Sequence, residues 1–114
     1  MSDAGVVYDI APDRTVIVPP PPLPEVFEPL ERIAAEMWPG APVVPTMETG
    51  ASDSIYTAAA GIPSYGFSGI ALESDDMRAH GKDERLPVES YYQGVEFYYR
   101  YLKAISSALS LIHI

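Results

Sequence analysis

Six residues near the N-terminus, PPPPLP from Pro19 to Pro24, most restrict what this chain can fold into. Each proline ring fixes φ at about −65° and removes a backbone N–H. The run therefore favours the polyproline II conformation and cannot join a central strand or a helix interior. We interpret residues 19–24 as a stiff linker. A ligand for an SH3-type domain is the alternative, although no arginine or lysine flanks the run to support it.

The two sides of this linker have different patterns. Residues 1–18 hold two strand-like runs, GVVYDI and RTVIV, separated by the turn-like APD. After the linker, apolar residues at helical spacing predict a helix up to the Pro39–Gly40 stop. Pro24 suits its first turn, whereas Pro29 fits only if it also lies there. The predicted apolar stripe consists of Val26, Leu30, Ile33 and Met37.

The rest of the chain alternates between strand-like and helical patterns. We expect short strands at 41–47 and 62–69, a short helix at 54–61, a charged loop at 73–85 and a long helix from about 88 to 108. The expected apolar stripe of the last helix consists of Val88, Tyr91, Val95, Tyr98, Leu102 and Ile105. The order α-β-α-β-loop-α predicts an α/β fold that contains only part of a sheet.

Charge and composition exclude several classes of function. The net charge is −9, which disfavours nucleic acid and anionic membranes and makes cations the more natural partners. No run of about 18 apolar residues predicts a membrane span. The chain has no cysteine, so a thiol nucleophile and a cysteine-bound zinc are excluded. None of these observations assigns a cellular compartment.

Two stretches could carry chemistry. In ETGASDS, residues 48–54, the turn containing Gly50, Ser52 and Asp53 opens a predicted helix, where backbone N–H groups can hold an anion. An ordinary helix cap by Ser52 or Asp53 is the alternative. In RAHGKDERL, residues 78–86, His80 lies among carboxylates and could bind zinc. One histidine cannot hold zinc by itself, so a solvated loop is the alternative there.

The order of three motifs resembles a known family. The motifs are Gly50–Asp53, Gly61–Pro63 and His80–Glu84, within the run VVPTMETGASDS…GIPSYGFSG…RAHGKDERLPVESYYQGVEFYYRYL. They are similar to the C-terminal part of M20-family zinc metallopeptidases, the enzymes like aminoacylase and Gly-X carboxypeptidase. The resemblance covers about residues 20–105.

This resemblance implies a fold, a cofactor and a set of roles. The fold would be the C-terminal portion of a mixed-sheet catalytic domain, spanning residues 25–108 here. Two zinc ions would activate water to cleave peptides or N-acyl amino acids, and His80 would be the last zinc ligand. Gly50, Ser52 and Asp53 would border the substrate pocket, and Glu84 would support the loop.

The resemblance also implies that parts of the enzyme lie elsewhere. The family's upstream ligands and its Glu-Glu general base have no counterpart, because neither HxD nor EE occurs here. We therefore expect a fragment that is inactive alone. Residues 1–18 would be the last strands of a lid domain through which the parent enzyme could form a homodimer, and the uncharged residues 109–114 would be a non-native tail. A non-catalytic binding or oligomerisation module is the alternative.

Overall fold

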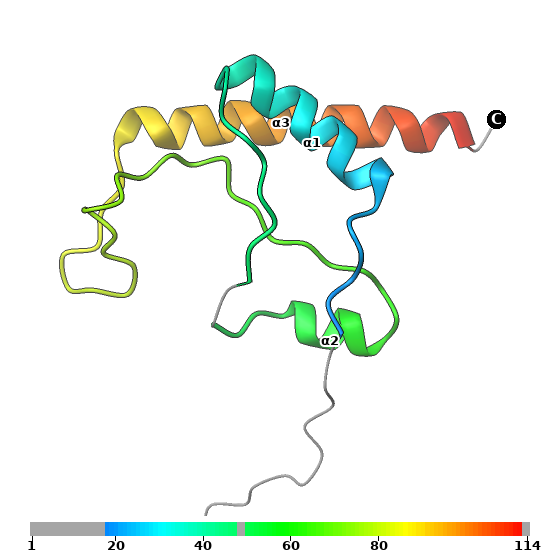
Figure 1. Cartoon of the computed structure of the whole chain (residues 1–114), viewed down its shortest axis with the longest axis horizontal. Helices are drawn as coiled ribbons and strands as arrows, with labels where there is room; N and C mark the ends of the chain where they lie inside the picture. The colour runs from blue at the N-terminus through cyan, green and yellow to red at the C-terminus, as the bar shows by residue number, and fades with distance from the viewer. Residues whose placement is uncertain (1–17, 48–49, 113–114) are drawn as a thin grey trace, which may run out of the picture. The chain divides into compact units, whose positions relative to one another are not determined.

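The structure is a computed structural model that describes residues 18–47 and 50–112 (Figure 1). The described residues contain three helices, α1 (Pro24–Met37), α2 (Ser54–Ala59) and α3 (Val88–Ile112). They divide into two compact units. Residues 51–64 belong to the small unit, whereas residues 21–50 and 65–112 belong to the larger one. The predicted boundaries at residues 18, 24 and 108 stay predictions.

The predicted α/β fold is wrong for the part of the chain that the structure describes. These residues form helices and loops, and neither 41–47 nor 62–69 is a strand. A strand is stable only where a neighbouring strand exchanges backbone hydrogen bonds with it, and the described residues offer no such neighbour. Pro42, Pro45 and Pro63 also lack the N–H that a strand must donate. The strands predicted within residues 1–17 lie outside the described residues.

Helix α1 begins and ends close to the predicted residues. Pro24 occupies its first turn, which needs no intrahelical N–H donor. Pro29 lies in the second turn and leaves one helical hydrogen bond unmade. The buried side of α1 carries Leu30, Ile33 and Ala34. The linker residues 19–23 before it have no regular structure.

Helix α3 is longer than predicted and buries a different side. Its buried residues are Gly94, Phe97 and Tyr101, which recur at intervals of three and four residues. Most of the predicted stripe is exposed: Val88, Tyr91, Val95, Tyr98 and Leu102. Apolar and aromatic residues occur on nearly every side of this helix, so periodicity alone selects the wrong side. Contact with α1 and with the segment before the charged loop decides which side is buried.

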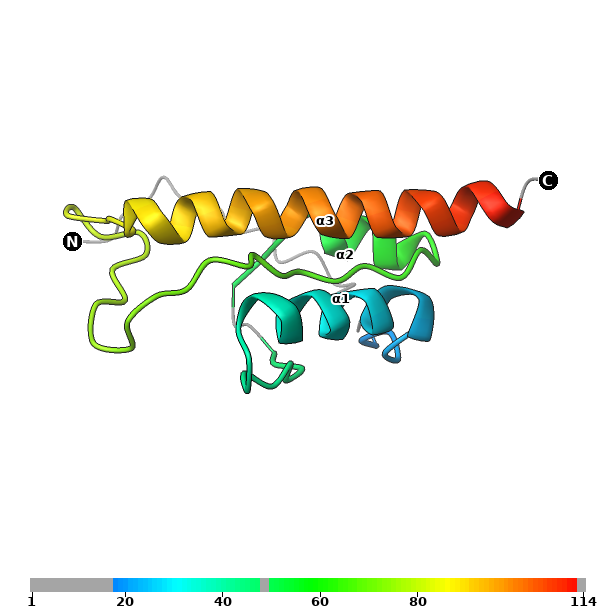
Figure 2. The same cartoon turned by 90° about the horizontal axis from the view of Figure 1, so that it is seen from above.

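The core lies where α1, α3 and residues 65–70 meet. Figure 2 shows the segment that follows residue 65 running between the two helices. The Phe67 ring packs edge-on against Tyr101, with centroids 4.8 Å apart, and lies 5.9 Å from Phe97. The centroid of the Trp38 ring lies 5.6 Å from that of Phe97. Tyr101 also donates a hydrogen bond from its hydroxyl to the Val26 carbonyl at 3.2 Å. Aromatic packing therefore holds α1 to α3.

Two glycines let the segment at 65–70 approach α3 closely. Gly69 has φ +61°, and a Cβ atom there would lie 2.5 Å from the Phe97 ring. A Cβ atom on Gly94 of α3 would lie 2.7 Å from Ile70. The absence of side chains at both positions permits this contact.

None of the helices in the described ranges combines the length and the apolar character that crossing a membrane requires.

Candidate functional site

The charged loop before α3 carries the histidine that the sequence singled out. Three turns shape this loop. Asp76 donates its N–H to the Glu73 carbonyl at 3.1 Å, Gly81 to the Arg78 carbonyl at 3.0 Å and Glu84 to the Gly81 carbonyl at 3.3 Å. These turns hold a loop that has no helix or strand of its own.

Two arginines tie the loop together through two aspartates. Arg78 donates hydrogen bonds to both Asp76 and Asp83. Arg85 reaches the same Asp76 carboxylate with two nitrogens, at 2.9 and 3.1 Å. Asp76 is thus shared by two guanidinium groups, and the four side chains form one network. Charge-assisted hydrogen bonds of this kind are stronger than neutral ones.

The hydrogen bonds of this network change the pKa values of Asp76 and Arg78. Hydrogen bonds from Arg85, and next from Arg78, lower the pKa of the Asp76 carboxyl below its ordinary value of 3.8. Hydrogen bonds to Asp76 and Asp83 raise the pKa of the Arg78 guanidinium. The Asp76 carboxylate is therefore ionised near neutral pH, and both Asp76 and Asp83 are paired with arginine. The sequence interpretation named the carboxylates of this loop but overlooked the arginines, although the alternating signs of D-x-R and D-x-R were visible.

His80 stands out by its backbone. Its φ is +64°, and it is the only non-glycine residue with positive φ in the described part of the chain. The left-handed conformation costs an L-residue roughly 1–2 kcal/mol, although histidine, asparagine and aspartate adopt it more often than others. Its side chain is exposed. A strained residue held in place by its surroundings is a reason to look for function there.

The described residues do not form a complete metal site around His80. They contain no group of three histidine, aspartate or glutamate side chains that could hold a metal ion. Asp76 and Asp83, the nearest candidates in sequence, are engaged by arginines. Glu84 is exposed, and its backbone N–H is part of the loop. The chemistry of an exposed imidazole fits zinc, but this part of the chain supplies one ligand and not a set.

The predicted substrate turn lies partly in each unit. Gly50 belongs to the larger unit, whereas Ser52 and Asp53 belong to the small one, and all three residues are exposed. Asp53 occupies the N-cap position of α2, but its carboxylate makes no capping hydrogen bond. The Ser52 hydroxyl accepts one from the Ser54 N–H instead, at 3.3 Å. Asp53 is therefore the N-cap residue, one of the two that the sequence offered, whereas the side-chain hydrogen bond at this end of the helix is made by Ser52.

The short helix α2 ends at Ala59, two residues before the predicted end at residue 61. Gly61 follows it with φ +80°, the left-handed conformation that commonly ends a helix. In the same unit, the Thr57 and Ser64 hydroxyls lie 2.5 Å apart, which joins α2 to the residues after it.

The sequence that forms these turns can be compared with the sequence profiles of known protein families. Residues 7–104 match the sequence profile of peptidase family M20/M25/M40. The chain belongs to this family. Membership of the M20/M25/M40 peptidases makes the function that of a metallopeptidase, a hydrolase for which peptides are the expected substrates. The matched range contains the predicted site residues, from Gly50 to Glu84.

Proposed function

We propose that this M20-family chain supplies His80 as one zinc ligand of a two-zinc centre that cleaves amide bonds in peptides or N-acyl amino acids. The observation that supports the proposal is the backbone of His80: an exposed imidazole on a left-handed residue. The loop around it is held by an arginine–aspartate network. Such a loop holds the backbone of His80 in the left-handed conformation at some cost in local stability.

The chain's own residues have distinct roles in this proposal. The imidazole of His80 binds one metal ion through a ring nitrogen. Glu84 keeps the turn at Gly81 in place through its backbone N–H, and its exposed carboxylate lies four residues from the histidine. Gly50, Ser52 and Asp53, all exposed, contact the substrate, because backbone N–H groups at a turn that opens a helix are suited to a carboxylate. When bound, two zinc ions lower the pKa of a shared water and stabilise negative charge on the substrate oxygen.

The remaining ligands and the general base come from residues other than those described, in a longer parent enzyme. A single imidazole leaves three positions of a tetrahedral zinc unfilled by this loop. The 114 residues are accordingly inactive alone and bind zinc weakly. The aminoacylase and Gly-X carboxypeptidase-like enzymes are the subtype that the motifs favour, and a lid domain including residues 1–18 would allow the parent to form a homodimer.

Calorimetric zinc titration of the 114-residue chain and of His80→Asn tests the metal role. Asparagine tolerates the left-handed backbone of residue 80 but removes the imidazole. We expect His80→Asn to lose the heat of zinc binding that the unchanged 114-residue chain shows. His113→Ala, which changes the other histidine of the chain, is the matched control and should keep it. Equal zinc binding by the unchanged 114-residue chain and by His80→Asn would show that this residue is not a ligand of the proposed centre.

A non-catalytic binding or oligomerisation module is the second candidate, and one observation favours it. Helix α3 exposes an apolar and aromatic side that includes Tyr92 at 67 % and Tyr99 at 62 % exposure. Isolated apolar residues on a surface are ordinary, whereas a contiguous patch indicates a contact surface. Sedimentation velocity separates the candidates: a concentration-dependent dimer, without zinc binding, would favour the module.

A further inference from the structure

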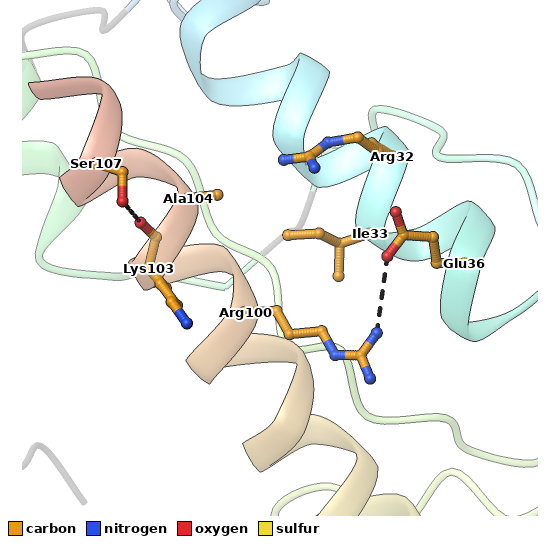
Figure 3. A pocket seen from close by; sticks show the side chains of 7 residues that line it. All are labelled: Arg32, Ile33, Glu36, Arg100, Lys103, Ala104 and Ser107. Carbon is orange, nitrogen blue, oxygen red and sulfur yellow. Dashed lines mark hydrogen bonds and ion pairs between the residues drawn. The ribbon is translucent and has the colours of Figure 1, made fainter. Parts of the chain in front are cut away.

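A cleft between the two long helices collects positive charge in an acidic chain. The cleft has a volume of about 270 Å³ and lies between α1 and the second half of α3 (Figure 3). Three of the chain's seven lysines and arginines line it: Arg32 from α1, and Arg100 and Lys103 from α3. The net charge of the whole chain is −9, so this is a local reversal of sign.

Arg32, Arg100 and Lys103 differ in the interactions that their charged groups make. Arg100 faces Glu36 across the cleft at 3.7 Å and donates to Glu96 on its own helix at 2.7 Å. Arg32 makes no ion pair with any residue in the described ranges. Lys103 also lacks a carboxylate partner there, and its ammonium group lies 5.9 Å from the centre of the Tyr99 ring. Arg32 and Lys103 are therefore the two cations of the cleft that make no ion pair among the described residues, although the Glu36 carboxylate also lines the cleft.

The cleft is also lined by two apolar residues and one serine. Ile33 and Ala104 form an apolar floor where the helices meet, and Ser107 lies at one end. The Ser107 hydroxyl donates to the Lys103 carbonyl at 2.8 Å (Figure 3). The cleft thus offers donors on charged, flexible side chains above a small apolar surface.

We propose that this cleft binds a compact dianion of the phosphate class, such as a phosphate monoester. Arg32 and Lys103, the two cations of the cleft that make no ion pair among the described residues, can each donate to one dianion. A guanidinium group and an ammonium group are the two cationic side chains that recognise phosphate oxygens. The site lies beside the second half of α3, whereas the loop of His80 precedes its first residue, so this site is separate from the proposed zinc ligand.

A phosphate titration of the 114-residue chain, followed by amide chemical shifts at constant ionic strength, tests this site. We expect saturable shifts around Arg32 and Lys103. Arg32→Gln and Lys103→Gln should each raise the Kd about tenfold, the effect of losing one charge-assisted hydrogen bond. Both residues are exposed, so the substitutions should leave the helices intact, and far-UV circular dichroism checks this. Acetate, a monoanion, should bind more weakly than phosphate.

Lys82→Gln is the matched control, because it removes the same charge from the loop rather than from the cleft. It should leave the phosphate Kd unchanged. Three results would overturn the proposal: shifts that do not saturate, equal weakening by Lys82→Gln, or acetate binding as tightly as phosphate. Zinc binding plays no part in the measurement, so the outcome is independent of the role of His80.

Discussion

At the scale of single residues, the loop before α3 depends on one shared carboxylate. Asp76 accepts hydrogen bonds from both Arg78 and Arg85, and no other side chain of the loop joins the two arginines. Asp76 is therefore the residue through which Arg78 and Arg85 are joined, on either side of His80 in the sequence. Because the network is exposed, water and salt weaken it, and its role is to order the loop rather than to stabilise the whole chain.

The lowered pKa of Asp76 makes the order of this loop depend on pH. A carboxyl group with a folded-state pKa below 3.8 contributes fully above that value, and the contribution is lost as the pH falls through the lower folded-state pKa. We expect the amide shift of Gly81 to change in this acidic range. In Asp76→Asn, the amide shift of Gly81 at neutral pH should already resemble the shift of the unchanged chain at acidic pH. Asp75→Asn is the control, and a parent-like response in Asp76→Asn would contradict the role of the network.

Gly69 is a second residue whose identity matters. In Gly69→Ala the new Cβ atom would meet the Phe97 ring at 2.5 Å and the backbone would remain left-handed. We expect the free energy of unfolding to fall by about 1–3 kcal/mol, the usual effect of overpacking a core. Gly66→Ala is the control, because a Cβ atom there meets nothing within 4 Å. Urea denaturation measures both, and equal stability of the two variants would show that the close approach is absent.

At the scale of elements, α3 shows where periodicity fails. Its tyrosines can lie on either side of the helix, since the ring packs while the hydroxyl reaches water or a backbone oxygen. Tyr98 illustrates this: the residue is partly exposed, yet its hydroxyl donates to the Phe67 carbonyl. The buried side is decided by Phe97 and Tyr101, which meet α1 and the segment at 65–70.

Substitutions on the two sides of α3 should therefore differ. Phe97 is 2 % exposed, so Phe97→Ala should lower the free energy of unfolding by about 3 kcal/mol or more, or abolish folding. Val95 is 51 % exposed and belongs to the stripe that periodicity predicted, so Val95→Ala should cost less than about 0.5 kcal/mol. Chemical denaturation followed by circular dichroism compares them. A larger loss of stability in Val95→Ala than in Phe97→Ala would indicate that the predicted stripe is the buried side.

At the scale of the whole molecule, the core is small. The buried apolar residues of the described ranges are Leu30, Ile33, Ala34, Phe97 and Tyr101, all in the larger unit. Ordinary domains have free energies of unfolding of roughly 5–15 kcal/mol, and a core of this size indicates the lower end of that range or less. We expect a broad thermal transition at a low midpoint for the isolated chain. A sharp monomeric transition at high temperature would contradict this.

Local features of the chain were predictable from the sequence. Helix α1 begins at Pro24, and Gly61 lies two residues beyond Ala59, the last residue of α2, because capping and φ preferences act within a few residues. The motifs from Gly50 to Glu84 indicated the M20 family, which the profile match confirms. The position of His80 in an exposed loop also followed from its charged neighbours.

Contacts between distant residues were decided only by the tertiary structure. The expected strands at 41–47 and 62–69 lack partners in the described residues, so apolar, β-prone sequence remains loop. The buried side of α3 follows from what packs against it, not from its own pattern. The same holds for Asp76, one of the carboxylates near His80 in the sequence, which pairs with Arg85, nine residues away. Sequence determines what each segment can do alone, whereas burial and charge pairing depend on partners that only folding brings together.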